Sequence, residues 1–422
     1  MRTLKIKKIQ LICTVIILLQ LVPSQILKYW PSINHYIYQL IYYMKNIGAL
    51  FLLLYVLSKP RNQITQMRAK KYINIFIPML LLFILVEVLA AFSSPIVSQY
   101  GIRYWTRCVA YFLDKVCILI EVACLYNICK TDVMKYISTT LIIDGFFTLF
   151  ITIVRTGIVS TLKVFFAVLG IVESETSLKM LEVHELTYCI GICLIYYVFV
   201  KLEKKNRMRI VLLTIFFILG GKRIAFAGVL VSGLFAVIVR KKGISKKSIV
   251  LIGAIGTSIC VGWIALLYNG EVMLLFARYG INVMGRDSLY SYFISRTSFS
   301  PQSIGWGLAA TTKAMENMTR AEVGNMVNVR GLHNDILKMY IDCGFVGSLI
   351  WYMLNLISIP LSILKKFGKK DATLYMALML FTFISYLTSN IESAFVYQVI
   401  LILIPLAMGE VGKSNETCQC VI

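Results

Sequence analysis

Long apolar runs recur along the whole chain, and they constrain its fold more than any other feature of the sequence. A helix needs about 20 apolar residues to cross the ~30 Å hydrocarbon layer of a membrane, and most of these runs approach that length. They are continuous, which argues against the ~10-residue alternating strands of a transmembrane β-barrel. Twelve spans are expected, at residues 9–27, 36–58, 73–93, 106–128, 134–154, 186–200, 210–221, 224–239, 249–268, 344–363, 372–389 and 394–409.

The overall composition excludes other classes of protein. Of the 422 residues, 59% are hydrophobic and 15% are charged, whereas soluble domains have about 45–50% and about 25%. A soluble enzyme, a secreted disulfide domain and a disordered scaffold are therefore excluded. The 11 cysteines form no CxxC pair and no zinc-ligand spacing, so we expect no metal and no cofactor. We predict an all-α polytopic membrane protein with a single transmembrane domain over residues 1–422.

The net charge of +23 is explained by topology rather than by a nucleic-acid partner. If the chain starts in the cytoplasm, most basic residues fall in the tails and on alternate short connections, as at Arg68–Lys71 and Arg240–Lys242. Basic residues concentrate in the cytoplasmic loops of membrane proteins. We therefore expect a multi-pass protein of the cytoplasmic membrane with both termini inside and no nucleic-acid partner.

One connection is far longer than the others. It joins the ninth and tenth spans over residues 269–343 and is rich in aromatic residues, among them Trp306. A linker would show a Ser, Pro or Lys bias instead. We predict a folded extracytoplasmic lid with short amphipathic helices that lie on the outer membrane face.

The fourth span carries more ionisable residues than the other spans. Arg107, Asp114 and Glu121 recur every seven residues and so share one helix face, with Lys115 adjacent. Glu87 and Asp144 on neighbouring spans are candidate partners. Two interpretations remain open: an ion-pair network that orients the helices, and a polar cavity that reaches into the membrane.

Basic residues on the predicted outer side indicate a phosphate-bearing partner, because a guanidinium forms two parallel hydrogen bonds to a phosphate. For residues other than Arg223, contact with lipid headgroups without catalysis is the alternative. The turn Gly220–Gly221 is expected to direct Arg223 inward, with Lys222 beside it. The lid adds further arginines, including Arg286, Arg296 and Arg330. The three histidines also fall on this side. His333 lies where the lid re-enters the membrane, and an imidazole there is suited to take a proton from a hydroxyl.

These residues carry a resemblance to a known family. The run His333-Asn334-x-x-Leu337, followed by Gly344 and Gly347 and preceded by Pro301 and Gly305-Trp306-Gly307, is similar to the signature of the O-antigen ligase and Wzy-type polysaccharide polymerase superfamily. Gly221-Lys222-Arg223 resembles its arginine turn, with Lys222 and Ile224 departing from the usual Ser and Gly. Gly285-Arg286-Asp287 resembles its second arginine site.

The resemblance implies a GT-C-like, metal-independent membrane glycosyltransferase that acts on glycans carried by undecaprenyl pyrophosphate. Arg223 and Arg286 would hold the donor pyrophosphate, and His333 would orient or deprotonate the acceptor hydroxyl. Asn334 would hold the imidazole or the sugar. Further substrate-binding candidates on the outer side are Lys222, Arg296, Arg330 and Trp306.

The expected function is polymerisation of lipid-linked oligosaccharide repeat units into capsule, exopolysaccharide or O-antigen, with the active site outside the cytoplasm. Two alternatives stay open: a ligase that moves a finished glycan to another acceptor, and a non-catalytic flippase for lipid-linked oligosaccharides. Besides the substrate and membrane lipids, the resemblance implies flippase and chain-length regulator proteins as partners.

Overall fold

The computed structural model describes residues 2–30, 34–58, 63–168, 183–200, 206–280, 286–318 and 331–408, and within them the chain is helical with no strand. Every one of the twelve predicted spans coincides with a helix. Five stretches are long and apolar enough to cross a membrane: Leu40–Leu57, Gln66–Ser93, Ile102–Thr156, Lys246–Tyr268 and Asp335–Phe367. Shorter apolar helices accompany them, which confirms an all-α polytopic membrane protein.

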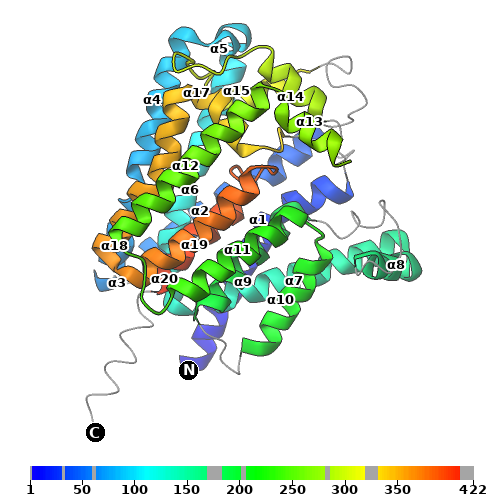
Figure 1. The fold of residues 1–422 in the computed structure, drawn as a ribbon. Coiled ribbons are helices and arrows are strands. Elements are labelled where there is room, and N and C mark those ends of the chain that lie inside the picture. Colours follow the sequence, from blue (N-terminus) through cyan, green and yellow to red (C-terminus); the bar gives the residue numbers. More distant parts are fainter. Residues whose placement is uncertain are drawn as a thin grey trace.

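The N-terminal helices form a first group, which extends in Figure 1 from α4 at the left of the view to α8 at the right. Helices α1 and α2 pack together, α2 also contacts α6, and α1 contacts α7. The bounds of this group are α1 Arg2–Tyr29, α2 His35–Leu57, α3 Gln63–Ile73, α4 Ile77–Ser93, α5 Pro95–Tyr100, α6 Ile102–Cys129, α7 Val133–Thr156 and α8 Ile158–Val168.

Helices α9 to α12 form a second group, which packs against the C-terminal helices. Helix α11 packs on α9 and α19, and α12 packs on α17. Glycines allow these close approaches: a Cβ at Gly228 would lie 2.8 Å from the Phe381 ring. The bounds are α9 His184–Val200, α10 Arg207–Leu219, α11 Arg223–Val239, α12 Lys246–Tyr268, α17 Asp335–Met353, a π-helical turn Leu354–Ser358, α18 Ile359–Phe367, α19 Lys369–Tyr386 and α20 Phe395–Met408.

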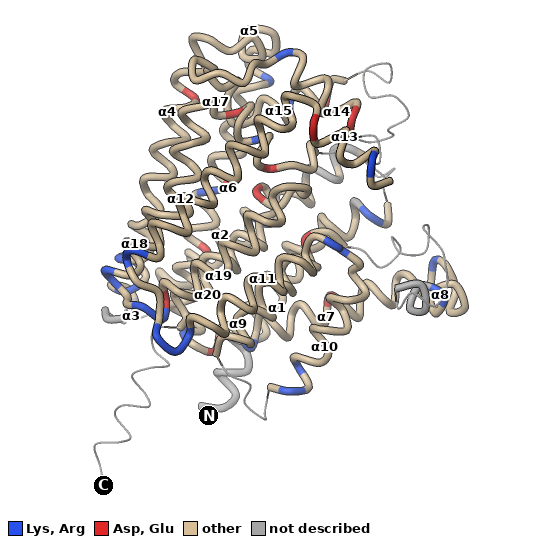
Figure 2. The backbone as a smooth tube through the Cα atoms, in the orientation of Figure 1, with Lys and Arg blue, Asp and Glu red and all other residues tan. Residues whose placement is uncertain are grey.

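The predicted lid contains three short described helices, α13 Glu271–Arg278, α14 Arg286–Ile294 and α15 Ala310–Glu316. They gather with α5 at one end of the bundle, whereas α3 and α18 lie at the opposite end (Figure 1). Lys and Arg residues are dense around α3 and α18 (Figure 2). The membrane sidedness of the two ends stays a prediction.

The lid is tied to α17 by main-chain contacts. Helix α17 kinks at Gly344, which has φ +74°, and the kink exposes main-chain carbonyls that accept hydrogen bonds from Trp306 and Gly307. A Cβ at Gly305 would lie 2.2 Å from the Asp342 carbonyl oxygen. The Gly-Trp-Gly motif and Gly344 therefore let two backbones meet where side chains would collide.

Candidate functional site

His333 lies in the short segment that joins the lid to α17. Its backbone has φ +52°, a left-handed conformation that costs a histidine energy and therefore requires fixed surroundings. The next residue, Asn334, caps α17, because its side-chain oxygen accepts a hydrogen bond from the Leu337 amide at 2.9 Å. Asp335 then accepts the amide hydrogens of Ile391 and Glu392 at 2.7 and 2.8 Å. His333 is thus held by the first residues of α17.

Two cations from other elements act on His333. Arg286 opens α14, and one of its guanidinium nitrogens lies 3.4 Å from the Thr388 carbonyl oxygen. Lys222 stands at the N-terminal boundary of α11. Burial, then Arg286, then Lys222 lower the pKa of His333 from 6.5 to about 4. The imidazole is therefore neutral at physiological pH and lies in a positive field.

The turn between α10 and α11 places Lys222 here. Gly221 has φ +61°, and a Cβ at Gly220 would lie 2.4 Å from the Thr187 hydroxyl oxygen. Both glycines are thus required for this tight approach to α9. Lys222 is half-buried, whereas Arg223 is exposed. The expected role of Arg223 stays a prediction.

The connection between α19 and α20, residues 388–392, forms the floor of the site, and the sequence analysis missed it. Its main-chain and side-chain groups contact four residues on three helices, α9, α14 and α17. Thr388 accepts from Arg286, Ser389 bonds the Tyr188 hydroxyl, the Asn390 carbonyl contacts His184, and Ile391 and Glu392 donate to Asp335. Main-chain carbonyls leave no residue-type pattern in a sequence, so no signal there indicated this role.

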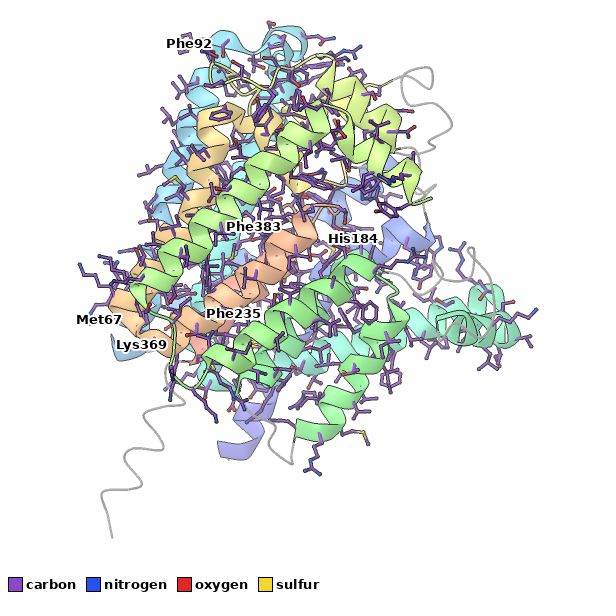
Figure 3. All side chains as sticks on the ribbon, in the orientation of Figure 1. Met67, Phe92, His184, Phe235, Lys369 and Phe383 are labelled. Carbon is purple, nitrogen blue, oxygen red and sulfur yellow. The ribbon has the colours of Figure 1, made fainter. Side chains whose placement is uncertain are left out.

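His184 is a second histidine at the site. It begins α9, and its ring lies 6.2 Å from the ring of His333 in an edge-to-face arrangement. The Tyr188 ring packs on its other side at 5.1 Å. Figure 3 shows His184 where the shorter helices α9 and α11 approach the lid. The sequence analysis placed His184 on the outer side but gave it no role.

The remaining substrate-binding candidates are spread out. Trp306 is only 8% exposed, and its ring packs 6.1 Å from Phe293. Arg296 is exposed and lies over the Tyr292 ring at 3.7 Å. Arg330 falls outside the described residues. The structure therefore brings together Lys222, Arg286, His333 and Asn334, and their roles stay predictions.

The polar residues of the fourth span pair with different neighbours. Asp114 lies 2.6 Å from Lys45 and Lys115 lies 2.5 Å from Glu392. Arg107 pairs with Glu316 in the lid, and Glu121 accepts a hydrogen bond from Gln20 at 2.7 Å. These contacts support the interpretation as a helix-orienting network.

The expected partners Glu87 and Asp144 are wrong as ion-pair partners. Glu87 accepts from the Tyr104 hydroxyl and the Leu308 amide, and Asp144 accepts from Gln25. A small cavity of about 70 Å³ does lie beside the network, with Lys115, Asn355, Glu392 and Gln398 as its polar lining.

Comparison with known proteins gives one finding for this chain. Residues 208–352 match the family model described as O-antigen ligase. The match covers about a third of the chain and includes Lys222, Arg286 and His333, but neither His184 nor residues 388–392. It confirms the resemblance drawn from the motifs and is consistent with the O-antigen ligase and Wzy-type superfamily. No curated protein matches the chain significantly.

The fold is that of a helical membrane protein, and the family match supports a ligase-like or polymerase-like role in surface glycan assembly. The match does not distinguish ligase from polymerase.

Proposed function

We propose that this protein polymerises undecaprenyl-pyrophosphate-linked oligosaccharide repeat units into surface polysaccharide on the outer face of the cytoplasmic membrane. The observation that carries the proposal is the convergence of Arg286 and Lys222 on the buried His333, where burial first and then these two cations lower the pKa of the imidazole to about 4. Two cations beside a neutral imidazole suit a reaction in which a diphosphate leaves and a hydroxyl loses a proton.

The reaction follows from this arrangement. The acceptor hydroxyl oxygen bonds to the anomeric carbon of the donor sugar, and the bond from that carbon to the diphosphate oxygen breaks. The hydroxyl proton passes to His333. Arg286 and Lys222 stabilise the negative charge that develops on the departing lipid diphosphate. No metal ion is required in this scheme, because the two cations supply the positive charge.

The two cations also couple donor binding to the base. With no donor present they disfavour protonation of His333, so the imidazole is a weak base. A bound diphosphate neutralises their field, and the pKa of His333 then rises toward its ordinary value. His333 becomes an effective base when the donor is in place, and this limits proton transfer before the sugar is positioned.

A ligase is the second candidate, favoured by the description of the matching family model. Polymerase and ligase share the donor chemistry and differ in the acceptor. A flippase is disfavoured by the fourth span, where Asp114 pairs with Lys45 and Lys115 pairs with Glu392. Charges that are neutralised in place do not form a polar path through both leaflets.

Reconstitution of the purified protein with lipid-linked repeat units, in chelator and without divalent metal, tests the proposal. A polymerase yields a ladder of products that grow by one repeat unit. A single transfer to an added lipid acceptor, without a ladder, would establish the ligase instead. Movement of the substrate between leaflets without any product would contradict both. A reporter fused at Lys313 in the lid should respond as extracytoplasmic, and a cytoplasmic response would overturn the topology.

A further inference from the structure

His184 has a hydrogen-bond partner that fixes which ring nitrogen carries the hydrogen. Its Nε2 lies 3.2 Å from the Asn390 carbonyl oxygen. A carbonyl oxygen only accepts, so Nε2 must be the N–H donor. In the neutral ring, Nδ1 is then left with a lone pair and acts as an acceptor.

The distance to His333 allows an indirect contact. Ring centroids 6.2 Å apart in an edge-to-face arrangement are too far for a direct N–H···N hydrogen bond. A single water oxygen between the two rings would accept from one ring and donate to the other. Charged groups that face His184 are Lys222 and Arg286, the same cations that act on His333.

The structure assigns His184 as a positioning residue for His333, through a directed chain of hydrogen bonds. The Asn390 carbonyl accepts from His184 Nε2, and His184 Nδ1 accepts, through one water, an N–H of His333. The other nitrogen of His333 then keeps its lone pair for the acceptor hydroxyl. These hydrogen bonds set the tautomer and the orientation of His333. They also take up part of the positive charge when His333 accepts the proton. This inference rests on the proposed function.

His184 lies outside the stretch that matches the family model, so the match does not assign it. Its position is nevertheless rigid. Val183 accepts from the Thr187 amide in the first turn of α9, and the Tyr188 ring packs against the imidazole. An imidazole that packs on Tyr188 and bonds the Asn390 carbonyl suits an orienting role.

Two substitutions at His184 separate orientation from packing. Leucine fills similar space but neither donates nor accepts. Glutamine can donate to the Asn390 carbonyl and also accept through its amide oxygen. In the reconstituted assay we expect His184→Leu to lower kcat about tenfold and leave KM for the lipid-linked donor within about twofold. His184→Gln should recover most of the lost kcat.

A matched control lies on the same helix. Tyr197 on α9 shares a buried hydrogen bond of 2.8 Å with Ser138, and Tyr197→Phe removes a bond of similar cost far from His333. This variant should keep wild-type kcat. If His184→Leu were fully active, or if Leu were active and Gln inactive, the inference would be overturned in favour of simple packing.

The second test is a double-mutant cycle. Because His184 acts through His333, His184→Leu should cost nothing further in a His333→Ala background. Additive losses of kcat would show that His184 acts independently of His333, which contradicts the proposed chain of hydrogen bonds. His333→Ala and Arg286→Ala run beside it: wild-type turnover in both would refute the proposed function, whereas loss in both with normal His184 variants refutes only this inference.

Discussion

Inside the bundle, basic groups lie against carboxylates, whereas at His333 two basic groups converge on imidazoles. Lys115 lies 2.5 Å from Glu392, and Lys338 lies 2.9 Å from Asp342. Within the described residues Arg286 forms no salt bridge and contacts only a main-chain carbonyl, that of Thr388. Pairing offsets part of the cost of burying a charge. At His333 the positive field of Arg286 and Lys222 favours an anionic ligand.

The two regions meet at residues 391 and 392. The amide of Glu392 donates to Asp335 below His333, and its carboxylate faces Lys115 and Lys338. The neutral network thus provides a fixed support for the cationic site. The comparison predicts that changes in the network alter stability, and that changes in the site alter turnover.

The largest effect should follow from Glu392→Ala. Lys115 and Lys338 would then share one buried space with reduced compensation. We expect a loss of about 3–5 kcal/mol in the free energy of unfolding, measured by thermal unfolding in detergent. Asp132→Ala, which removes the half-exposed partner of Lys135, should change stability by less than about 1 kcal/mol. Equal losses in the free energy of unfolding for the two variants would show that the buried ion pairs contribute no more to stability than the surface pair.

Next come His333→Ala and Arg286→Ala. Each should reduce turnover about hundredfold or more, since each removes the base or a stabilising cation. Accumulation in the membrane and thermal unfolding should stay near wild type. Arg286→Lys should also be strongly impaired if two-pronged phosphate binding matters. A stable, fully active Arg286→Ala protein would remove this arginine from the mechanism.

Lys222 and Arg223 provide a paired comparison of neighbours. Lys222→Met should lower turnover about tenfold, because one of two cations near the diphosphate is lost. Arg223→Met should have a smaller effect, since its side chain is exposed. The measurement is the turnover rate of the two variants, each reconstituted in vesicles of the same composition. A severe defect in Arg223→Met with normal Lys222→Met would restore the arginine assignment made from the motif.

The smallest effect is a shift between two pH profiles. A base is active when unprotonated, so kcat/KM for the free enzyme should fall as the pH drops through about 4, the pKa of His333. The fall in kcat, which reports the donor complex, should occur at higher pH, because the bound diphosphate offsets Arg286 and Lys222. If kcat and kcat/KM fell at the same pH, donor binding would not change the pKa of His333, and the proposed coupling would be contradicted. In Lys222→Met the acid limb of kcat/KM should move upward.

The fold was largely predictable because hydropathy is local. A stretch of apolar residues long enough for a membrane must satisfy its main-chain hydrogen bonds internally, so it forms a helix. All twelve predicted spans are helical, and the Gly305-Trp306-Gly307 motif lies where the lid meets α17. The motif order also indicated the family whose model matches residues 208–352, a stretch that includes His333.

The site was predictable only in part, because its geometry depends on contacts between distant segments. Residue types identified Arg286 and His333 as candidates, but whether Lys222 or Arg223 faces His333 is set by how α11 packs on α9 and α19. His184, about 150 residues from His333 in sequence, reaches it only through the fold. The carbonyls of Thr388 and Asn390 belong to every sequence alike, so only the tertiary structure could bring them to the site. Sequence determines which segments become helices through their own transfer to lipid, and packing between those helices decides which polar groups meet.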